Sequence, residues 1–139
     1  MKDEFLNRIN LLTSDSEPKY GQLTVHQMVC HCTDFYRLAL GKIHLKEKPF
    51  LDAQEAIQLA QAKKKVPSPK ELDQVAGNGT PPDEFKADIV LLKKHLEEFY
   101  NLNEGYDYPP HFYFGKLNHL EWKKIADYHM NHHLRQFKV

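Results

Sequence analysis

Apolar residues recur along most of the chain at the three- and four-residue intervals of an amphipathic helix. The first such segment spans residues 2–12 and predicts a short helix. The second begins at Thr24, where a capping-box pattern with Gln27 is expected to satisfy free backbone N–H groups. Gly41 marks its expected end, near residues 40–43. The apolar faces of these two segments consist of Phe5, Ile9, Leu12, Val25, Met28, Cys32, Phe35, Ala39 and Ile43.

The middle of the chain is less regular. Residues 51–65 favour a helix of modest length, because alanine and glutamine are good helix formers. Prolines and glycines at residues 67–82 then predict a loop. A third long helix is expected to start at Thr80, which precedes a proline, and to run to about Leu102. Its core face is expected to consist of Phe85, Ile89, Leu92, Leu96 and Phe99 or Tyr100.

An aromatic loop at residues 106–115 precedes the last helix. Asn118 and Glu121 form a second capping-box pattern, and this helix is expected to run to about Gln136. No segment shows sustained period-two alternation, so no sheet is expected. The pattern predicts an all-α fold, a four-helix bundle in a single domain over residues 1–139.

Charge and composition disfavour several classes of partner. Lys plus Arg and Asp plus Glu both total 19, so the net charge is zero and a nucleic-acid partner is not expected. The basic run at residues 63–65 is interpreted as a solvated helix end. No stretch approaches the ~18 consecutive apolar residues of a membrane span, and no signal-peptide core is present. Cys30 and Cys32 are two residues apart on a predicted helix and point in different directions, so they cannot pair with each other. Two reduced thiols favour a cytoplasmic location.

Two histidines of the last helix are the most specific chemical feature of the sequence. His129 and His133 are four residues apart, which places both imidazoles on one helical face. Relative to Trp122 they fall at roughly −20° and +20°, in the middle of the face expected to be buried. Buried imidazoles need hydrogen-bond partners or a metal ion. His31 lies on the flank of the apolar stripe of the second helix, so three neutral imidazoles from two helices predict a metal site with an open position.

The other polar residues are assigned by their position. His132 falls at the edge of the stripe and is expected to line the margin of the site, and Gln136 is the best candidate for a polar group in the pocket. His111 is a third pocket-lining candidate, because functional residues concentrate in loops. His26 is expected to face water. Surface positions are also expected for His44, His95 and His119.

Several motifs in combination resemble the DinB-like superfamily. They are residues 20–24, residues 27–31, residues 114–122 and residues 129–137, the last reading His-x-x-His-His-Leu-Arg-Gln-Phe. The closest similarity is to a bacterial branch of domains of unknown function, and it extends over about residues 6–137. Two positions depart from that branch, since Tyr20 replaces its usual Trp and Phe112 replaces a common Pro. Both departures concern the mouth of the pocket and leave the proposed ligands intact.

The resemblance implies a four-helix bundle in up-down-down-up order with His31, His129 and His133 as the metal ligands. Superfamily members bind zinc or nickel, and several are transferases that join low-molecular-weight thiols to electrophiles. Hydrolases and isomerases also occur, and many members are homodimers. A small-molecule substrate, with a cellular thiol as one example, and a homodimer are therefore implied as partners.

Three functional hypotheses stay open from the sequence. The first is a metal-dependent enzyme that transfers a thiol or hydrolyses a small substrate. The second is a non-catalytic module that binds a metal or small ligand, because the motifs contain no evident carboxylate base and Asp34 and Asp127 are expected to point away. The third is a structural bundle whose histidines are hydrogen-bonded core residues.

Overall fold

The computed structural model describes residues 1–46 and 51–139, and these residues contain α-helices and one short 3-10 helix but no strand. The predicted all-α class is therefore confirmed for the described residues. Residues 47–50, part of the segment predicted to be irregular, lie outside them. The elements are α1 (Lys2–Ile9), α2 (Val25–Ala39), α3 (Ala53–Gln61), η1 (Lys70–Leu72), α4 (Phe85–Tyr100) and α5 (His119–Gln136).

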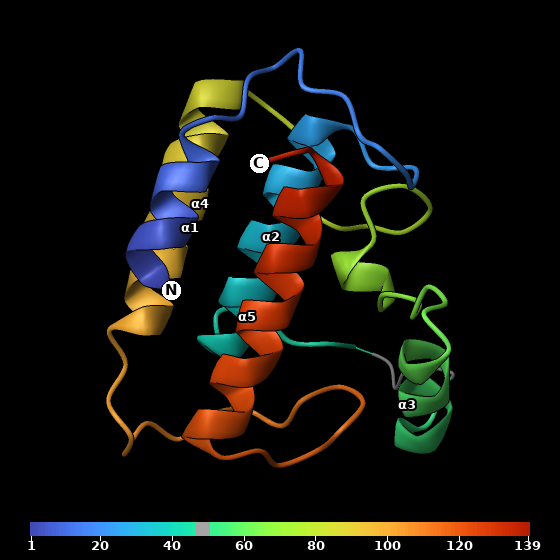
Figure 1. The fold of residues 1–139 in the computed structure, drawn as a ribbon. Coiled ribbons are helices and arrows are strands. Elements are labelled where there is room, and N and C mark those ends of the chain that lie inside the picture. The colour runs from blue at the N-terminus through green and yellow to red at the C-terminus, as the bar shows by residue number, and fades with distance from the viewer. Residues whose placement is uncertain (47–50) are drawn as a thin grey trace.

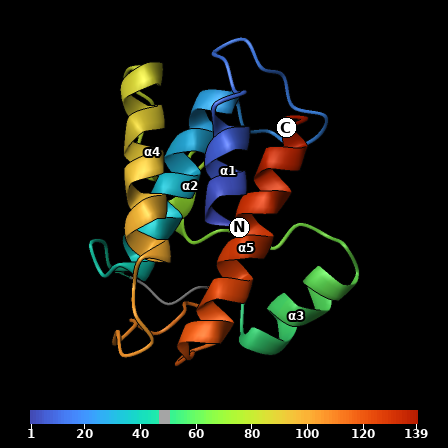
Figure 2. The same cartoon turned by 60° about the vertical axis from the view of Figure 1, so that its left-hand side comes forward.

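Four of the helices pack side by side, and α3 stands apart from them (Figures 1 and 2). Helix α2 contacts both α4 and α5, and α1 also contacts α4 and α5. Helix η1 contacts α2 from the long segment between α3 and α4. This arrangement brings α2 and α5, the two helices with the candidate ligands, next to each other.

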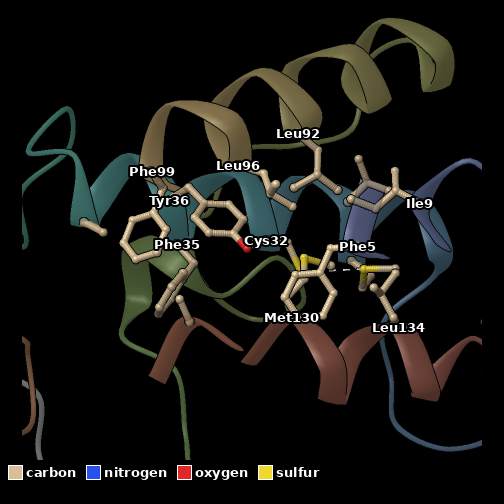
Figure 3. Packing of buried hydrophobic residues seen from close by; sticks show 14 of the residues in the cluster. Phe5, Ile9, Cys32, Phe35, Tyr36, Leu92, Leu96, Phe99, Met130 and Leu134 are labelled. Atoms are coloured by element: carbon tan, nitrogen blue, oxygen red, sulfur yellow. Dashed lines mark hydrogen bonds between the residues drawn. The ribbon is translucent and has the colours of Figure 1, made fainter. Parts of the chain in front are cut away.

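The apolar core lies between these four helices (Figure 3). The predicted core residues of α1 and α2 are buried, whereas Ile43, beyond the end of α2, is only partly buried. Trp122 is fully buried and stacks on Tyr108, with ring centroids 5.6 Å apart. Each large apolar side chain buried here contributes roughly 1.5–3 kcal/mol relative to an exposed position. This core fixes how α2 and α5 face each other.

The helix starts follow local capping chemistry. Both predicted capping boxes are present, at Thr24 for α2 and at Asn118 for α5. Helix α4 begins later than predicted, because Glu84 rather than Thr80 provides the capping side chain. The backbone N–H and the hydroxyl group of Thr80 instead donate to the carboxylate of Asp34, at 2.8 and 2.7 Å. The expected start at Thr80 was wrong because a tertiary contact occupies that side chain.

Asp34 also holds the loop that contains η1 against α2. Its carboxylate is buried and accepts further hydrogen bonds from the side chains of Gln74, at 2.8 Å, and Arg37, at 3.0 Å. A buried carboxylate needs such partners, because an uncompensated charge in the interior is very costly. The loop fixed in this way includes Leu72, whose backbone carbonyl group reaches the candidate site.

The two cysteines are both free, as predicted. Cys30 lies near Asp88 of α4, with sulfur and oxygen 3.8 Å apart, whereas Cys32 contacts the sulfur of Met28 at 3.7 Å. Among the helices of the described residues, none combines the length and apolar character needed to cross a membrane. The cytoplasmic location stays a prediction.

Candidate metal centre

Three histidines from α2 and α5 converge at one place in the structure. His31 comes from α2, and His129 and His133 come from successive turns of α5. One ring nitrogen from each lies within 4.8 Å of the other two. The Nε2 atoms of His31 and His129 are 3.0 Å apart. The structure therefore brings together the three residues that the sequence singled out.

Packing of the two helices explains this convergence. The apolar face of α5 turns its histidines toward α2, since Met130 and Leu134, next to them in sequence, are fully buried. The ring of His129 stacks on Phe35 of α2, with centroids 4.3 Å apart and an interplanar angle of 21°. Phe35 lies one helical turn beyond His31, so a single face of α2 provides both a donor nitrogen and a stacking surface.

Hydrogen bonds fix the protonation pattern of two imidazoles. The Nδ1–H of His31 donates to the backbone carbonyl oxygen of Leu72 at 2.6 Å, and that of His133 donates to Oε1 of Gln136 at 2.9 Å. A carbonyl oxygen only accepts, so each proton is on Nδ1 and each Nε2 keeps its lone pair. Gln136 is itself oriented, because its amide nitrogen donates to the carbonyl oxygen of Tyr20 at 2.8 Å. Partners of this kind orient histidine ligands in metal sites.

The electrostatic surroundings keep the cluster neutral. Burial lowers the pKa of His31, because desolvation penalises the charged ring. Burial, followed by the neighbouring rings of His133 and His31, lowers the pKa of His129 well below its ordinary value. Burial and His31 also lower the pKa of His133 well below its ordinary value, although the hydrogen bond to Gln136 acts in the opposite direction. At neutral pH all three rings are therefore in the form that binds metal ions.

The donor set fits a divalent ion of borderline softness. Zn–N bonds of about 2.0–2.1 Å in tetrahedral geometry place ligand nitrogens about 3.3 Å apart. The 3.0 Å between Nε2 of His31 and Nε2 of His129 is close to that spacing. Three imidazoles leave a fourth position open, as catalytic sites do. Zinc, nickel, copper and iron all accept such ligands, so the donors do not select one metal.

The three pocket-lining candidates lie at different distances from this cluster. Gln136 accepts a hydrogen bond directly from His133. His132 lies at the margin, half-buried, with its ring 5.0 Å from that of His133 and 5.8 Å from that of Tyr20. His111 is buried and packs against Trp122, and it is not one of the three converging residues.

His111 has a structural role in the aromatic loop. Its Nδ1 accepts hydrogen bonds from the backbone N–H groups of Tyr113 and Phe114, at 3.1 and 3.3 Å. Burial lowers the pKa of His111 to about 4, so the ring is neutral at pH 7. A protonated His111 would lower the pKa of His129, but its effect is smaller than those of His133, His31 and His132.

Several expectations for the other histidines need correction. His26 does not simply face water, since its Nε2 lies 2.6 Å from a carboxylate oxygen of Asp88. His95 is buried rather than on the surface, and its Nδ1–H donates to the carbonyl oxygen of Leu91 at 2.7 Å. His119 is only partly exposed and lies 2.9 Å from the hydroxyl group of Tyr108. These rings pack against neighbouring elements that a helical projection of one segment does not include.

Some residues that support the cluster have no signal in the sequence. The carbonyl groups of Leu72 and Tyr20 are backbone atoms, which any residue type provides. They accept from His31 and from Gln136, and both lie far along the chain from these partners. Phe35 was expected in the core, but its stacking on His129 depends on how α2 and α5 face each other. Asp34 and Asp127 were expected to have no role in the site, and their hydrogen bonds go elsewhere, Asp127 accepting from the hydroxyl group of Tyr100 at 2.5 Å.

Comparison with known proteins adds a family but no activity. Searches among curated proteins and among solved structures found no match. The family described as "Protein of unknown function (DUF1569)" matches residues 2–139, a range that includes all three histidines and the helices that hold them. The chain therefore belongs to the DUF1569 family.

Proposed function

We propose that His31, His129 and His133 bind one divalent metal ion, zinc or nickel, and that this centre makes the protein a metal-dependent enzyme acting on a small molecule. The favoured reaction is transfer of a low-molecular-weight thiol to an electrophile. Hydrolysis of a small substrate is the second reaction that the same centre would support.

The hydrogen bonding of the imidazoles carries this proposal. Leu72 and Gln136 fix the Nδ1 protons of His31 and His133, which leaves two Nε2 lone pairs inside the cluster. In neutral rings the contact between His31 and His129 can hold one proton at most. A proton on Nε2 of His129 would satisfy His31 alone, and the Nε2 lone pair of His133 would still have no donor or cation among the described hydrogen bonds. A divalent ion satisfies all three nitrogens at once.

The surroundings of the cluster favour thiol transfer over hydrolysis. When bound, a divalent ion supplies a Lewis acid that lowers the pKa of a thiol or of water at the open position. Within the described residues, no carboxylate shares a hydrogen bond with the three imidazoles, so hydrolysis would lack an adjacent carboxylate base. An ionised thiol is a nucleophile without further proton removal. His132, whose pKa is lowered by burial and by Arg135, is neutral at the margin, where it would take up the proton that a thiol or a water loses on binding the ion.

The proposal includes the fold. We infer that α1, α2, α4 and α5 form an up-down-down-up four-helix bundle of the DinB-like superfamily, in one domain. The packing of these four helices on one another supports this inference, as do the motifs at both ends of the chain. A homodimer belongs to the same proposal, and light scattering on the purified protein tests it.

Metal analysis of the purified protein tests the centre. Plasma mass spectrometry would be applied to untagged wild-type protein, to His129→Ala and to a control variant, His44→Ala, in which an exposed histidine is removed. We expect wild type and control to contain equal amounts of zinc or nickel, and His129→Ala to contain one equivalent less. Equal metal content in all three proteins, also after reloading, would refute the centre.

Turnover by the metal-loaded protein then separates the two functional classes. We expect a haloarene electrophile to be consumed with at least one of several cellular thiols, and His129→Ala to be inactive. Metal binding without turnover would favour the alternative, a non-catalytic metal- or ligand-binding module. This alternative is supported by the hydrogen bonds of the three imidazoles, none of which joins a carboxylate in the part of the chain that the structure describes.

A further inference from the structure

A second group of potential metal ligands lies between α2 and α4. His26 and Cys30 are one turn apart on α2, and Asp88 lies in the first turn of α4. One donor atom from each, a ring nitrogen, the sulfur and a carboxylate oxygen, lies within 4.8 Å of the other two. Figures 1 and 2 show α2 and α4 packed along each other, which holds the three residues together.

The carboxylate of Asp88 is the centre of this group. Its Oδ2 lies 2.6 Å from Nε2 of His26, 3.8 Å from Sγ of Cys30 and 3.0 Å from the backbone nitrogen of Asp83. A sulfur-to-oxygen distance of 3.8 Å is long, so the thiol group contributes only a weak hydrogen bond. The sulfur of Cys30, a good metal ligand, therefore lies close to the Asp88 carboxylate without a strong hydrogen bond to it.

The spacing of these atoms is near that of a tetrahedral zinc site. Standard bond lengths place sulfur and oxygen ligands about 3.6 Å apart and nitrogen and oxygen ligands about 3.4 Å apart. The contact between Cys30 and Asp88 already has nearly this length. For an ion to bind, Nε2 of His26 and Oδ2 of Asp88, now 2.6 Å apart, must separate by about 0.8 Å. Small side-chain rotations are sufficient for this change.

Exposure and chemistry define which ion would bind. The side chains of His26 and Asp88 are 22% and 13% exposed, so an ion can enter from solvent without unfolding of the helices. Cys30 lies beneath them, only 3% exposed. A set of nitrogen, sulfur and oxygen ligands suits zinc and similar ions, and does not suit magnesium or calcium.

We propose that His26, Cys30 and Asp88 form a second divalent-cation site, for zinc or an ion of similar softness, separate from the three-histidine cluster. Binding releases the thiol proton of Cys30 to solvent, and the sulfur then binds the ion as a thiolate without any change of oxidation state. The Nε2 proton that His26 donates to Asp88 in the metal-free site exchanges into solvent, so that His26 keeps a single proton on Nδ1 and binds the ion through Nε2. The ion would link α2 to the first turn of α4.

Cys32 provides a matched control on the same helix. It is fully buried and contacts Met28, so the structure predicts that it cannot bind an ion at this site. Cobalt is a suitable probe, because a cobalt–thiolate bond gives a charge-transfer absorption in the near ultraviolet and an all-histidine site does not. The full-length protein would be titrated with cobalt as wild type, Cys30→Ser, Cys32→Ala and Asp88→Asn, with circular dichroism to check folding.

We expect the charge-transfer band in wild type and in Cys32→Ala and its loss in Cys30→Ser. Asp88→Asn keeps the size of the side chain but removes its charge, and we expect cobalt to bind at least tenfold more weakly there. The band should also persist in His129→Ala, which separates this site from the histidine cluster. No band in wild type at saturating cobalt, or an unchanged band in Cys30→Ser, would overturn the proposal and leave the group as a hydrogen-bonded contact.

Discussion

Gln136 offers a sensitive test of how the histidine cluster is held. Its side chain joins His133 to the backbone of Tyr20, accepting from one at 2.9 Å and donating to the other at 2.8 Å. Gln136→Leu keeps approximately the same volume and removes both hydrogen bonds. The ring of His133 then loses the partner that fixes its Nδ1 proton.

The expected magnitude follows from these two bonds. Each contributes about 0.5–1.5 kcal/mol, and the buried N–H of His133 left without an acceptor costs about 1–3 kcal/mol. We therefore expect the metal-free variant to lose about 2–6 kcal/mol of unfolding free energy. Loss of an outer partner of a metal-binding histidine typically weakens binding 10- to 100-fold, and we expect the same range for zinc here.

Two measurements separate these effects. Urea unfolding of the metal-free protein gives the stability change, and competition with a chromophoric chelator gives the zinc affinity. Gln136→Glu is the matched variant, since a carboxylate still accepts from His133 but no longer donates to Tyr20. We expect Gln136→Glu to bind zinc as tightly as wild type or more tightly, although its stability falls.

A substitution at Gly21 tests the same hydrogen bond between Gln136 and His133 without changing either residue. Gly21 has a φ of +87°, and a Cβ atom there would collide with the side-chain amide of Gln136. Gly21→Ala should therefore displace Gln136 and weaken zinc binding without altering any polar group of the site. If Gln136→Leu and Gly21→Ala both bind zinc with wild-type affinity while His133→Ala does not, Gln136 has no part in orienting the ligand and the reasoning is wrong.

Three further predictions concern stability. In a Cys30→Ala background, which removes the second site, zinc at 100 times its dissociation constant should add about 2.7 kcal/mol and raise the melting temperature by roughly 10 °C in calorimetry, and a chelator should reverse this rise. Asp34→Asn should cost about 3 kcal/mol in urea unfolding, because Thr80 and Gln74 lose a charged acceptor; a cost below about 1 kcal/mol would show that the loop is held by other contacts. The pKa of His111 is about 4 in the folded protein, below the unfolded value of about 6.5, so the unfolded chain binds more protons between these limits and stability falls as the pH drops through that window, by up to about 3 kcal/mol. Unfolding curves of metal-free His111→Asn should lack this part of the pH dependence, and an unchanged slope would contradict the assignment.

Local sequence patterns were sufficient to predict most of the helices. The capping boxes at Thr24 and Asn118 are complete within four residues, so the starts of α2 and α5 could be predicted from neighbouring side chains. The start of α4 could not be predicted in this way. Thr80 has the features of a helix start, but its hydroxyl and N–H groups bond to Asp34, which is 46 residues away in the chain.

The candidate ligands could be predicted because helical geometry fixes the relation between His129 and His133. Their four-residue spacing places them on one face of α5 in any fold that keeps the helix, and the surrounding apolar pattern turns that face inward. The part played by His26 was not predicted. Its partner Asp88 is on a different helix, and only the packing of α2 on α4 brings the two within 2.6 Å.

Local sequence was sufficient for the helical class, the helix faces and the places of the three histidines on those faces, because these depend on contacts between residues a few positions apart. Which atoms surround the histidines depends on how distant segments pack together. The carbonyl groups of Leu72 and Tyr20 come from segments remote in the chain, and every residue carries such a carbonyl group. Side-chain identity therefore predicts which imidazoles are available, whereas only packing in three dimensions sets their proton positions and brings their nitrogens together.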